Sequence, residues 1–385
     1  MPFNVLEPTG DLLKIFRDEL WKEKRLLEVI QSSGDGGRLL RKHFENRGQV
    51  ESELRNLSAL REQCPTCVPI VLAHAERHID LQYIEGARIY TVLEALKTIE
   101  AFDENAGVAR QNLLNRCVGT CSQVQRVLAQ QPASANRKCY PLRRKLLSLL
   151  SLFDHCLALR LNLEELGAEL DQAERFLDRL SCSVPFRDAT PKNLILAWPE
   201  IWPGRTAPGR QLDLLRNAMA DLSLHRSSPL AEAPILNIDF SSCDEFTVPE
   251  DDPISLLFHE PSWFGGLPSA EKLLWLGIEP DPARLAIGLA IRMYRLGGRR
   301  LSYRLVHANG YRARYSNESI AFHFRCLIEA SGSICTDLRS RFPALLSATR
   351  AILSRLDEGL YTSTDWFEPM YGSQPSRYYR DVYPY

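Results

Sequence analysis

The feature that most constrains this chain is the segment 186–193, Phe-Arg-Asp-Ala-Thr-Pro-Lys-Asn, which leads into the apolar run Leu-Ile-Leu. Asp188 stands five residues ahead of Asn193, and Pro191 lies between them. Proline favours turns, and a short apolar run is typical of a buried strand. The segment therefore predicts a loop that presents a carboxylate base and a carboxamide metal ligand at the start of a strand.

A second acidic residue follows a later apolar segment. Residues 235–240 read as a strand, and Asp239 lies near its end, before Ser241 and Ser242. Phosphoryl transfer needs a group that orients the attacking hydroxyl, together with oxygen ligands for Mg²⁺. Asp188, Asn193 and Asp239 would supply both.

These residues resemble the protein-kinase pattern H-R-D-x-x-x-x-N followed by D-F-G. They are more similar to the aminoglycoside phosphotransferase and choline kinase group, which reads H-G-D-x-x-x-x-N and then I-D-F or I-D-W, although Phe186 replaces the usual histidine. The resemblance implies an α+β, bilobal protein-kinase-like fold. Its small antiparallel-sheet N-lobe would cover residues 1–85, its large and mainly helical C-lobe residues 86–385, with an insertion at about 197–233.

Lys42, in the N-terminal part of the chain, is a candidate for the cation that binds nucleotide phosphates. A strong hairpin-turn sequence over residues 32–37 precedes the strand-like segment 38–44, and Lys42 lies on the apolar face of that strand. The resemblance makes Lys42 the lysine that contacts nucleotide phosphates. A register shift of one residue would put Arg41 there instead, and a solvated edge-strand lysine is the other interpretation.

A helix that follows this strand holds the partner that the resemblance assigns to Lys42. Residues 49–61 show helical periodicity, with leucines on one face. Glu53 matches the E-x-x-x-L-x-x-L helix of the group, whose glutamate pairs with the strand lysine. Glu51 is the fallback, because the helix is rich in Glu and Arg and could present a solvated face.

The segment 80–86, Asp-Leu-Gln-Tyr-Ile-Glu-Gly, resembles the hinge of the group, which often ends E-Y-I-E-G. The resemblance places the adenine of ATP against the backbone of Gln82, Tyr83 and Ile84. Residues 16–24, where a phosphate-covering glycine loop is expected, contain no glycine. A pseudokinase therefore stays open as an alternative.

Composition excludes several other classes of protein. The 385 residues are 45% hydrophobic and 25% charged, as in ordinary globular proteins, and the net charge is −1. A nearly neutral chain does not bind nucleic acid or anionic membranes by general electrostatic attraction. The start shows no secretory signal, and no apolar run is long enough to span a bilayer, so we expect a cytoplasmic protein.

Most of the ten cysteines are scattered singly, as buried thiols usually are. Cys64 and Cys67 form a C-x-x-C pair, and His74 and His78 follow. Zinc uses such ligands, but the gap between the two pairs is shorter than in zinc fingers. We expect thiols near a loop, with zinc as the alternative.

The chain after residue 89 is mostly helical in periodicity. Helices are predicted over 92–99, 113–128, 142–163 and 166–180.

Segment 284–314 is rich in arginine and has no Asp or Glu. This composition argues against a polycationic acceptor, unless the arginines pair with acidic residues elsewhere. These arginines are Arg284, Arg292, Arg295, Arg299, Arg300, Arg304, Arg312 and Arg314.

We therefore predict an ATP-dependent phosphotransferase that moves the γ-phosphoryl group to a hydroxyl of a small, non-polycationic molecule such as a sugar, nucleoside or natural product. In this hypothesis Asp188 orients the hydroxyl and takes its proton, and Arg187 braces the loop. Asn193 and Asp239 hold Mg²⁺. The alternative is a pseudokinase or a protein-kinase-like regulatory scaffold.

Overall fold

The computed structural model describes residues 27–31, 38–100, 103–131, 138–180, 184–185, 187, 189–201, 208–238, 240, 245–259, 281–298, 300–301 and 317–358. The chain divides into two compact units, Met1–Ala133 with Arg187–Cys243, and Ser134–Phe186 with Asp244–Tyr385. Both units combine helices with short strands, so the α+β class with a small antiparallel sheet is as predicted. Asp188, Asp239, segment 16–24 and the Tyr-rich tail 361–385 lie outside the described residues.

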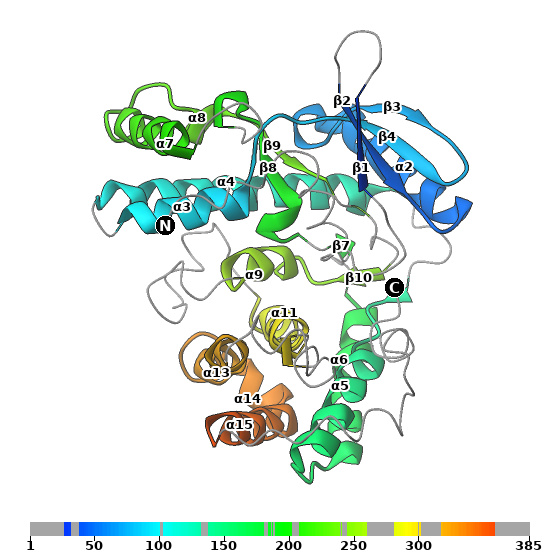
Figure 1. Cartoon of the computed structure of the whole chain (residues 1–385). Coiled ribbons are helices and arrows are strands. Elements are labelled where there is room, and N and C mark those ends of the chain that lie inside the picture. The colour runs from blue at the N-terminus through cyan, green and yellow to red at the C-terminus, as the bar shows by residue number, and fades with distance from the viewer. Residues whose placement is uncertain are drawn as a thin grey trace. The chain divides into compact units, whose positions relative to one another are not determined.

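The first unit contains a four-stranded antiparallel sheet of order β1-β2-β4-β3 (Figure 1). The hairpin predicted around residues 32–37 is confirmed by the pairing of Gln31 with Arg38. Lys42 of β2 is buried, and so are the three consecutive residues Ile79, Asp80 and Leu81 of β4. The strands are β1 Leu27–Gln31, β2 Arg38–His43, β3 Val71–His74 and β4 His78–Gln82.

Helix α2, Arg47–Gln63, covers the buried face of this sheet (Figure 1). Asn46 caps its start, because its side chain accepts a hydrogen bond from Gln49 N at 3.0 Å. Apolar residues three and four apart place one stripe of the helix in the core. The core cluster joins Val50, Leu57 and Leu60 of α2 to Ile79 and Leu81 of β4, and to Val124, Val127 and Leu128 of the long helix α4, Asn105–Gln130.

A second antiparallel sheet of the first unit, of order β5-β8-β9, links the predicted hinge to the predicted catalytic loop. A Cβ added at Gly86 would lie 2.1 Å from the carbonyl oxygen of Leu196. Only glycine therefore lets the chain pass so close to β8. The strands are β5 Ala87–Arg88, β8 Leu194–Leu196 and β9 Ile235–Asn237.

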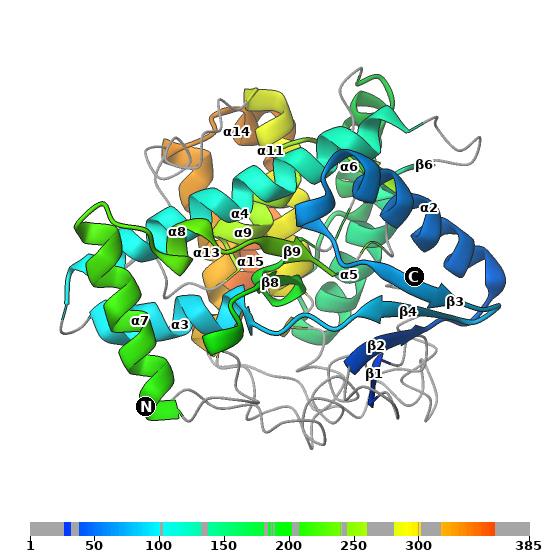
Figure 2. The same ribbon diagram turned by 90° about the horizontal axis from the view of Figure 1, so that it is seen from above.

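The segment 197–233, expected to be an insertion, is helical in its described part. It contains a helix that packs against α4 at a steep angle, as Figure 2 shows. Leu215 and Met219 are buried there, and the buried Gln211 donates its side-chain amide to the carbonyl of Ile201 at 2.9 Å. The remaining elements of this unit are η1 Pro65–Cys67, α3 Ile89–Glu100, α4 Asn105–Gln130, η2 Pro191–Asn193, η3 Pro199–Ile201, α7 Pro208–Ser223 and α8 Pro229–Glu232.

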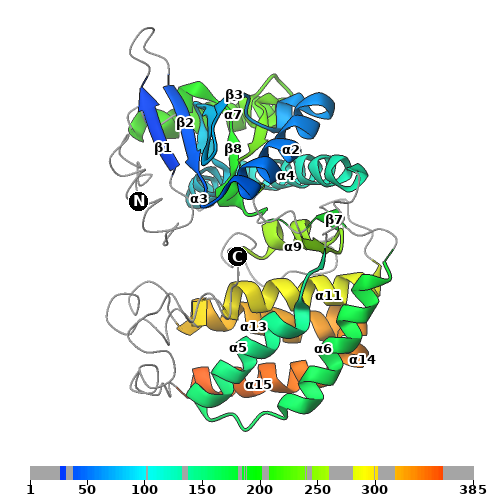
Figure 3. The same ribbon diagram turned by 90° about the vertical axis from the view of Figure 1, so that its right-hand side faces the viewer.

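The second unit is a helical assembly with one small sheet of order β6-β10-β7 (Figure 3). Its core includes Phe324, whose ring meets Phe153 and Tyr294 edge-on at centroid distances of 6.5 and 5.4 Å. Its elements are β6 Lys138–Cys139, α5 Leu142–Leu157, α6 Leu163–Asp178, β7 Val184–Pro185, β10 Glu245–Thr247, α9 Asp251–Leu257, α11 Pro282–Met293, the π-helical turn η5 Tyr294–Gly298, α13 Asn317–Ser333, α14 Asp337–Arg341 and α15 Pro343–Asp357.

The four helices predicted between residues 89 and 180 are confirmed as α3 to α6, with two boundaries misplaced. The helix predicted over 113–128 begins earlier, at Asn105. The helix predicted over 142–163 ends at Leu157, because Ala158 and Arg160 have φ of 50° and 57°, outside the helical region. Helices α3 and α4 group with the N-terminal sheet, while the lobe boundary after residue 85 stays a prediction. No helix among the described residues is long and apolar enough to cross a membrane.

Candidate active site

The most distinctive polar feature of the first unit is a buried ion pair between β2 and α2. Lys42 Nζ donates to Glu53 Oε1 at 2.6 Å, and the two side chains are only 4% and 1% exposed. The ammonium also lies 5.5 Å from the ring centre of Phe44. An ammonium this deeply buried is retained only with compensating charge and hydrogen bonds. The strand and helix periodicities together place these two predicted residues in contact.

The neighbouring charged residues make different pairs. Arg41 points to the other side of β2 and forms two hydrogen bonds with Asp80 of β4, at 2.7 and 2.8 Å. Those hydrogen bonds hold the pKa of Asp80 below its ordinary value. Glu51, the fallback partner, is exposed and pairs with Arg47 at 2.7 Å. The structure therefore brings Lys42 together with Glu53, and neither Arg41 nor Glu51 takes that place.

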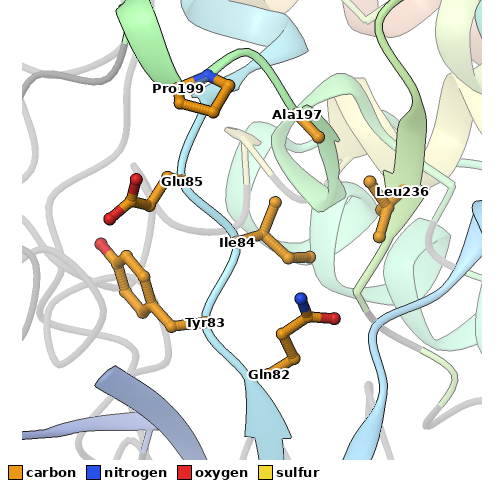
Figure 4. A pocket seen from close by; sticks show the side chains of 7 residues that line it. All are labelled: Gln82, Tyr83, Ile84, Glu85, Ala197, Pro199 and Leu236. Carbon is orange, nitrogen blue, oxygen red and sulfur yellow. The ribbon is translucent and has the colours of Figure 1, made fainter. Parts of the chain in front are cut away.

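The predicted hinge residues line a pocket of about 360 Å³ in the first unit. Its wall comprises Gln82, Tyr83, Ile84, Glu85, Ala197, Pro199 and Leu236. Figure 4 shows Ile84 pointing toward Ala197 and Leu236, while Tyr83 and Glu85 lie on the opposite side of the linker. The pocket combines an apolar wall with polar groups, as small-molecule sites do.

The described part of the predicted catalytic loop is attached to its unit at both ends. Arg187 is buried, and its Nη2 donates to the backbone carbonyl of Cys121 in α4 at 3.3 Å. The backbone N–H of Asn193 donates to Thr190 at 2.9 Å, and Ile238 N donates to the carbonyl of Asn193 at 3.1 Å. The hydrogen bond to Cys121 links Arg187 to α4. The role of Arg187 as a brace of the loop stays a prediction. The hydrogen bond to Ile238 brings Asn193 to the end of β9.

The two predicted acidic residues of the site lie outside the described residues. Asp188 is flanked by the described Arg187 and Ala189, and Asp239 by Ile238 and Phe240. Within the described ranges, no group of three or more His, Cys, Asp or Glu could hold a metal ion. Of the predicted Mg²⁺ ligands, the structure therefore describes Asn193 alone.

The cysteine pair lies beside the same unit's core. Cys64 and Cys67 are both buried at η1, and the Sγ of Cys67 contacts Gln123 Oε1 at 3.4 Å. Burial raises the pKa of Cys64 to about 12, which favours the neutral thiol. His74 is exposed on β3. The pair behaves as buried thiols beside a turn.

Two arginines of segment 284–314, Arg284 and Arg292, have carboxylate partners in the second unit. Arg284 Nε donates to Glu250 Oε1 at 2.9 Å, and Arg292 Nε donates to Asp251 Oδ1 at 2.7 Å. Burial raises the pKa of Asp251 to about 6, although Arg292 opposes the shift. Arg299, Arg304, Arg312 and Arg314 lie outside the described residues. For Arg284 and Arg292, the interpretation that arginines of this segment pair with carboxylates holds.

The sequence reasoning missed contacts that depend on the fold. Ala197, Pro199 and Leu236 join the pocket only because β8 and β9 pair across the long intervening segment. The ammonium of Lys192 lies 5.1 Å from the ring centre of Tyr90 in α3. Lys192 is inside the predicted loop, but nothing in the local pattern points to Tyr90.

The fold and this site define an α+β protein with a buried lysine–glutamate pair and a small-molecule-sized pocket in one unit. No family model matches the sequence, and no curated protein sequence matches it. Among solved structures the chain is similar to the apoenzyme of macrolide 2′-phosphotransferase MphH from Brachybacterium faecium. That likeness has a TM-score of 0.36 and 12% identity, and it covers 81% of this chain and 97% of the other. A likeness of that size assigns no activity to this chain.

Proposed function

We propose that the protein is an ATP- and Mg²⁺-dependent phosphotransferase with a protein-kinase-like arrangement, which moves the γ-phosphoryl group to a hydroxyl of a small molecule. The observation that carries the proposal is the buried contact of Lys42 with Glu53 at 2.6 Å. A lysine on a strand, held by a glutamate of the next helix, is how kinase-like enzymes position an ammonium at nucleotide phosphates.

The described residues fit a nucleotide. The pocket of about 360 Å³ falls within the size range of small-molecule sites. Ile84, Ala197 and Leu236 offer an apolar wall to a heterocyclic base, and the backbone between Gln82 and Glu85 offers donors and acceptors for its edge. Lys42 would contact the phosphates.

The metal would be held by Asn193 and Asp239. Asn193 fits because its carboxamide offers an oxygen ligand, and its backbone is fixed to the residue that precedes Asp239. When bound, ATP would supply the phosphoryl group, and Mg²⁺ would neutralise its charge. Asp188 accepts the hydrogen bond of the acceptor hydroxyl and takes its proton, while Arg187 holds the loop against α4.

The test is ATP turnover against a panel of hydroxylated small molecules, comparing the wild type with Asp188→Asn and Asp239→Asn. Both variants should lower transfer by about 10²- to 10⁴-fold, because each removes a group that acts on the reacting atoms. Asp213→Asn is the matched control, since Asp213 is exposed on α7. Transfer that survives both site substitutions undiminished would sink the assignment.

Other outcomes favour other functions. If the wild type neither binds nor hydrolyses Mg²⁺-ATP, a pseudokinase scaffold is the better interpretation. If label from ATP enters protein instead of the small molecule, the chain is a protein kinase.

A further inference from the structure

One polar side chain of the hinge pocket, that of Gln82, comes from a strand whose backbone is fixed. Gln82 is the last residue of β4 and is paired with Leu39 of β2. Its backbone N–H also donates to the carbonyl of Ile70 at 2.8 Å. Side chains carried by strands are positioned more precisely than side chains carried by loops. The sheet therefore fixes the position from which the carboxamide of Gln82 starts.

Gln82 lines the pocket on the same side as its apolar wall. Alternate residues of an extended chain point to opposite sides. Figure 4 shows Gln82 and Ile84 on the side of the linker that faces Ala197 and Leu236. Ile84, Ala197 and Leu236 have apolar side chains. Among the described residues that line the pocket, Gln82 thus brings a polar side chain to this wall.

A ligand in the pocket can reach the carboxamide of Gln82, because this residue is exposed. A carboxamide offers an acceptor oxygen and an NH₂ donor side by side. Apolar groups hold a flat heterocycle with little regard to the groups on its edge, whereas a few polar groups fix its orientation and identity. Selection between bases is therefore expected from Gln82 together with the hinge backbone.

The two purine bases differ at the edge that a carboxamide matches. Adenine presents the N6 amino donor beside the N7 acceptor, so that glutamine Oε1 accepts from N6 while Nε2 donates to N7. Guanine presents two acceptors, O6 and N7, at the same edge. A glutamine can donate to one of them, but its own oxygen then faces the other, which stays unpaired. A glutamine in this position therefore favours adenine, and the rest of the base stays available to the hinge backbone.

We propose that the carboxamide of Gln82 recognises the edge of the nucleotide base that carries N6 and N7, and so selects ATP over GTP. The inference rests on the proposed function, because it makes Gln82 a specificity-determining residue of the same nucleotide site. Lys42, which would contact the phosphates, does not distinguish two nucleotides that differ only in the base.

The test is the affinity of the full chain for Mg²⁺-ATP and Mg²⁺-GTP, measured by titration calorimetry. Gln82→Met keeps an unbranched side chain and removes the carboxamide. It should lower the ratio of ATP over GTP affinity by about 5- to 150-fold, as expected for one lost bidentate pair. Gln82→Arg should move the preference toward GTP, because a guanidinium donates to both O6 and N7 of guanine.

Gln63→Met is the matched control. Gln63 is an exposed glutamine of the same unit, at the end of α2 and outside the pocket lining. Its replacement should leave the ratio of ATP over GTP affinity unchanged. A Gln82→Met variant that keeps the ratio of the wild type, or that loses affinity for ATP and GTP equally, would overturn the proposal.

An ATP analogue with C–H in place of N7 tests the contact directly. The wild type should bind it about 2- to 10-fold more weakly than ATP, because one hydrogen bond is lost. Gln82→Met should bind the analogue and ATP equally well. Equal affinity of the wild type for the two nucleotides would contradict the contact.

Binding needs no turnover, so these measurements separate the inference from the proposed function. A preference for ATP that is lost in Gln82→Met, in a protein that transfers no phosphoryl group, would support the role of Gln82 and contradict the proposed function. Phosphoryl transfer with a preference that Gln82→Met leaves unchanged would contradict the role of Gln82 alone. A protein that binds neither nucleotide would overturn both.

Discussion

Each unit contains a buried cation–carboxylate pair, and the two pairs are built differently. In the first unit Lys42 meets Glu53 from the following helix at 2.6 Å. In the second unit Arg292 is fully buried between α11 and α9, bonded to Asp251 and 3.7 Å from Asp252. Burial alone therefore does not mark a functional pair.

The chemistry of the two cations separates their roles. A guanidinium that bonds both oxygens of a carboxylate is fixed in direction, and such pairs join elements of structure. An ammonium is compact, lies on a flexible stem and has donors for more than one acceptor. Lys42 also shares its unit with the pocket and the predicted loop. The lysine pair is suited to a ligand, and the arginine pair to packing.

The largest effect on stability should come from Arg292→Met. It leaves the buried Asp251 and Asp252 without their guanidinium, and breaking a buried pair in this way costs about 3–5 kcal/mol of the free energy of unfolding. Urea unfolding followed by circular dichroism measures the loss. Lowering the pH toward 5 should reduce it. Without Arg292, which lowers the pKa of Asp251, that carboxyl takes up a proton more readily than in the wild type, where its pKa is about 6.

The double variant Arg292→Met with Asp251→Leu is the companion test. It removes both charges and should recover part of the stability, and phosphoryl transfer should remain. A double variant that folds but loses transfer would give the arginine pair a role in function.

The double variant Lys42→Met with Glu53→Leu should show the opposite result: it should keep its stability and lose phosphoryl transfer. Replacing both charges by apolar groups is close to neutral for stability, since no buried charge is left alone. Transfer should nevertheless fall by about 10²- to 10³-fold, the usual loss when one electrostatic stabiliser of a transition state is removed. ATP turnover and urea unfolding on the same preparation give both values. Full transfer in this variant would reduce the lysine pair to a structural contact.

Local patterns predicted the lysine pair because each of its members depends on one element. Lys42 follows from alternation in a strand. The choice of Glu53 and its pairing with Lys42 follow from the resemblance to the E-x-x-x-L-x-x-L helix of the phosphotransferase group. The same local reasoning could not assign Arg292, whose partner Asp251 lies 41 residues away. Nor could it complete the pocket, because Ala197 and Leu236 meet Ile84 only after β8 pairs with β9. Contacts that depend on pairing between distant segments could not be predicted from local sequence patterns.

A half-buried carboxylate that is held by backbone N–H groups extends the comparison. Glu169 of α6 accepts hydrogen bonds from the backbone N–H groups of Ala344 and Leu345, at 2.8 and 2.9 Å, at the start of α15. Burial raises its pKa from 4.5 to about 7, and nearby Glu165 adds to the shift. Because the folded state holds this proton more tightly, stability from Glu169 is present below pH 4.5 and falls as the pH rises to about 7.

The free energy of unfolding of Glu169→Gln should therefore increase relative to that of the wild type as the pH rises. Between pH 4.5 and about 7, the difference in unfolding free energy should shift in favour of the variant by about 1–2 kcal/mol, discounted because Glu169 is only half-buried. Urea unfolding at several pH values measures it. A difference that does not change with pH would contradict the raised pKa.

The smallest effect is expected from Arg41→Gln, which tests the register that separates Arg41 from Lys42. Arg41 is 29% exposed and pairs with Asp80, so its loss should cost only about 1 kcal/mol at pH 7. The pKa of Asp80 is held below 3.8, hence the stabilisation is present above that pH and is lost as the pH falls further. The difference in unfolding free energy between the wild type and Arg41→Gln should be smaller at pH 3.5 than at pH 7, as measured by urea unfolding. Transfer should stay near that of the wild type, and a loss as large as in the Lys42 variant would mean that the phosphates bind on the Arg41 side of β2.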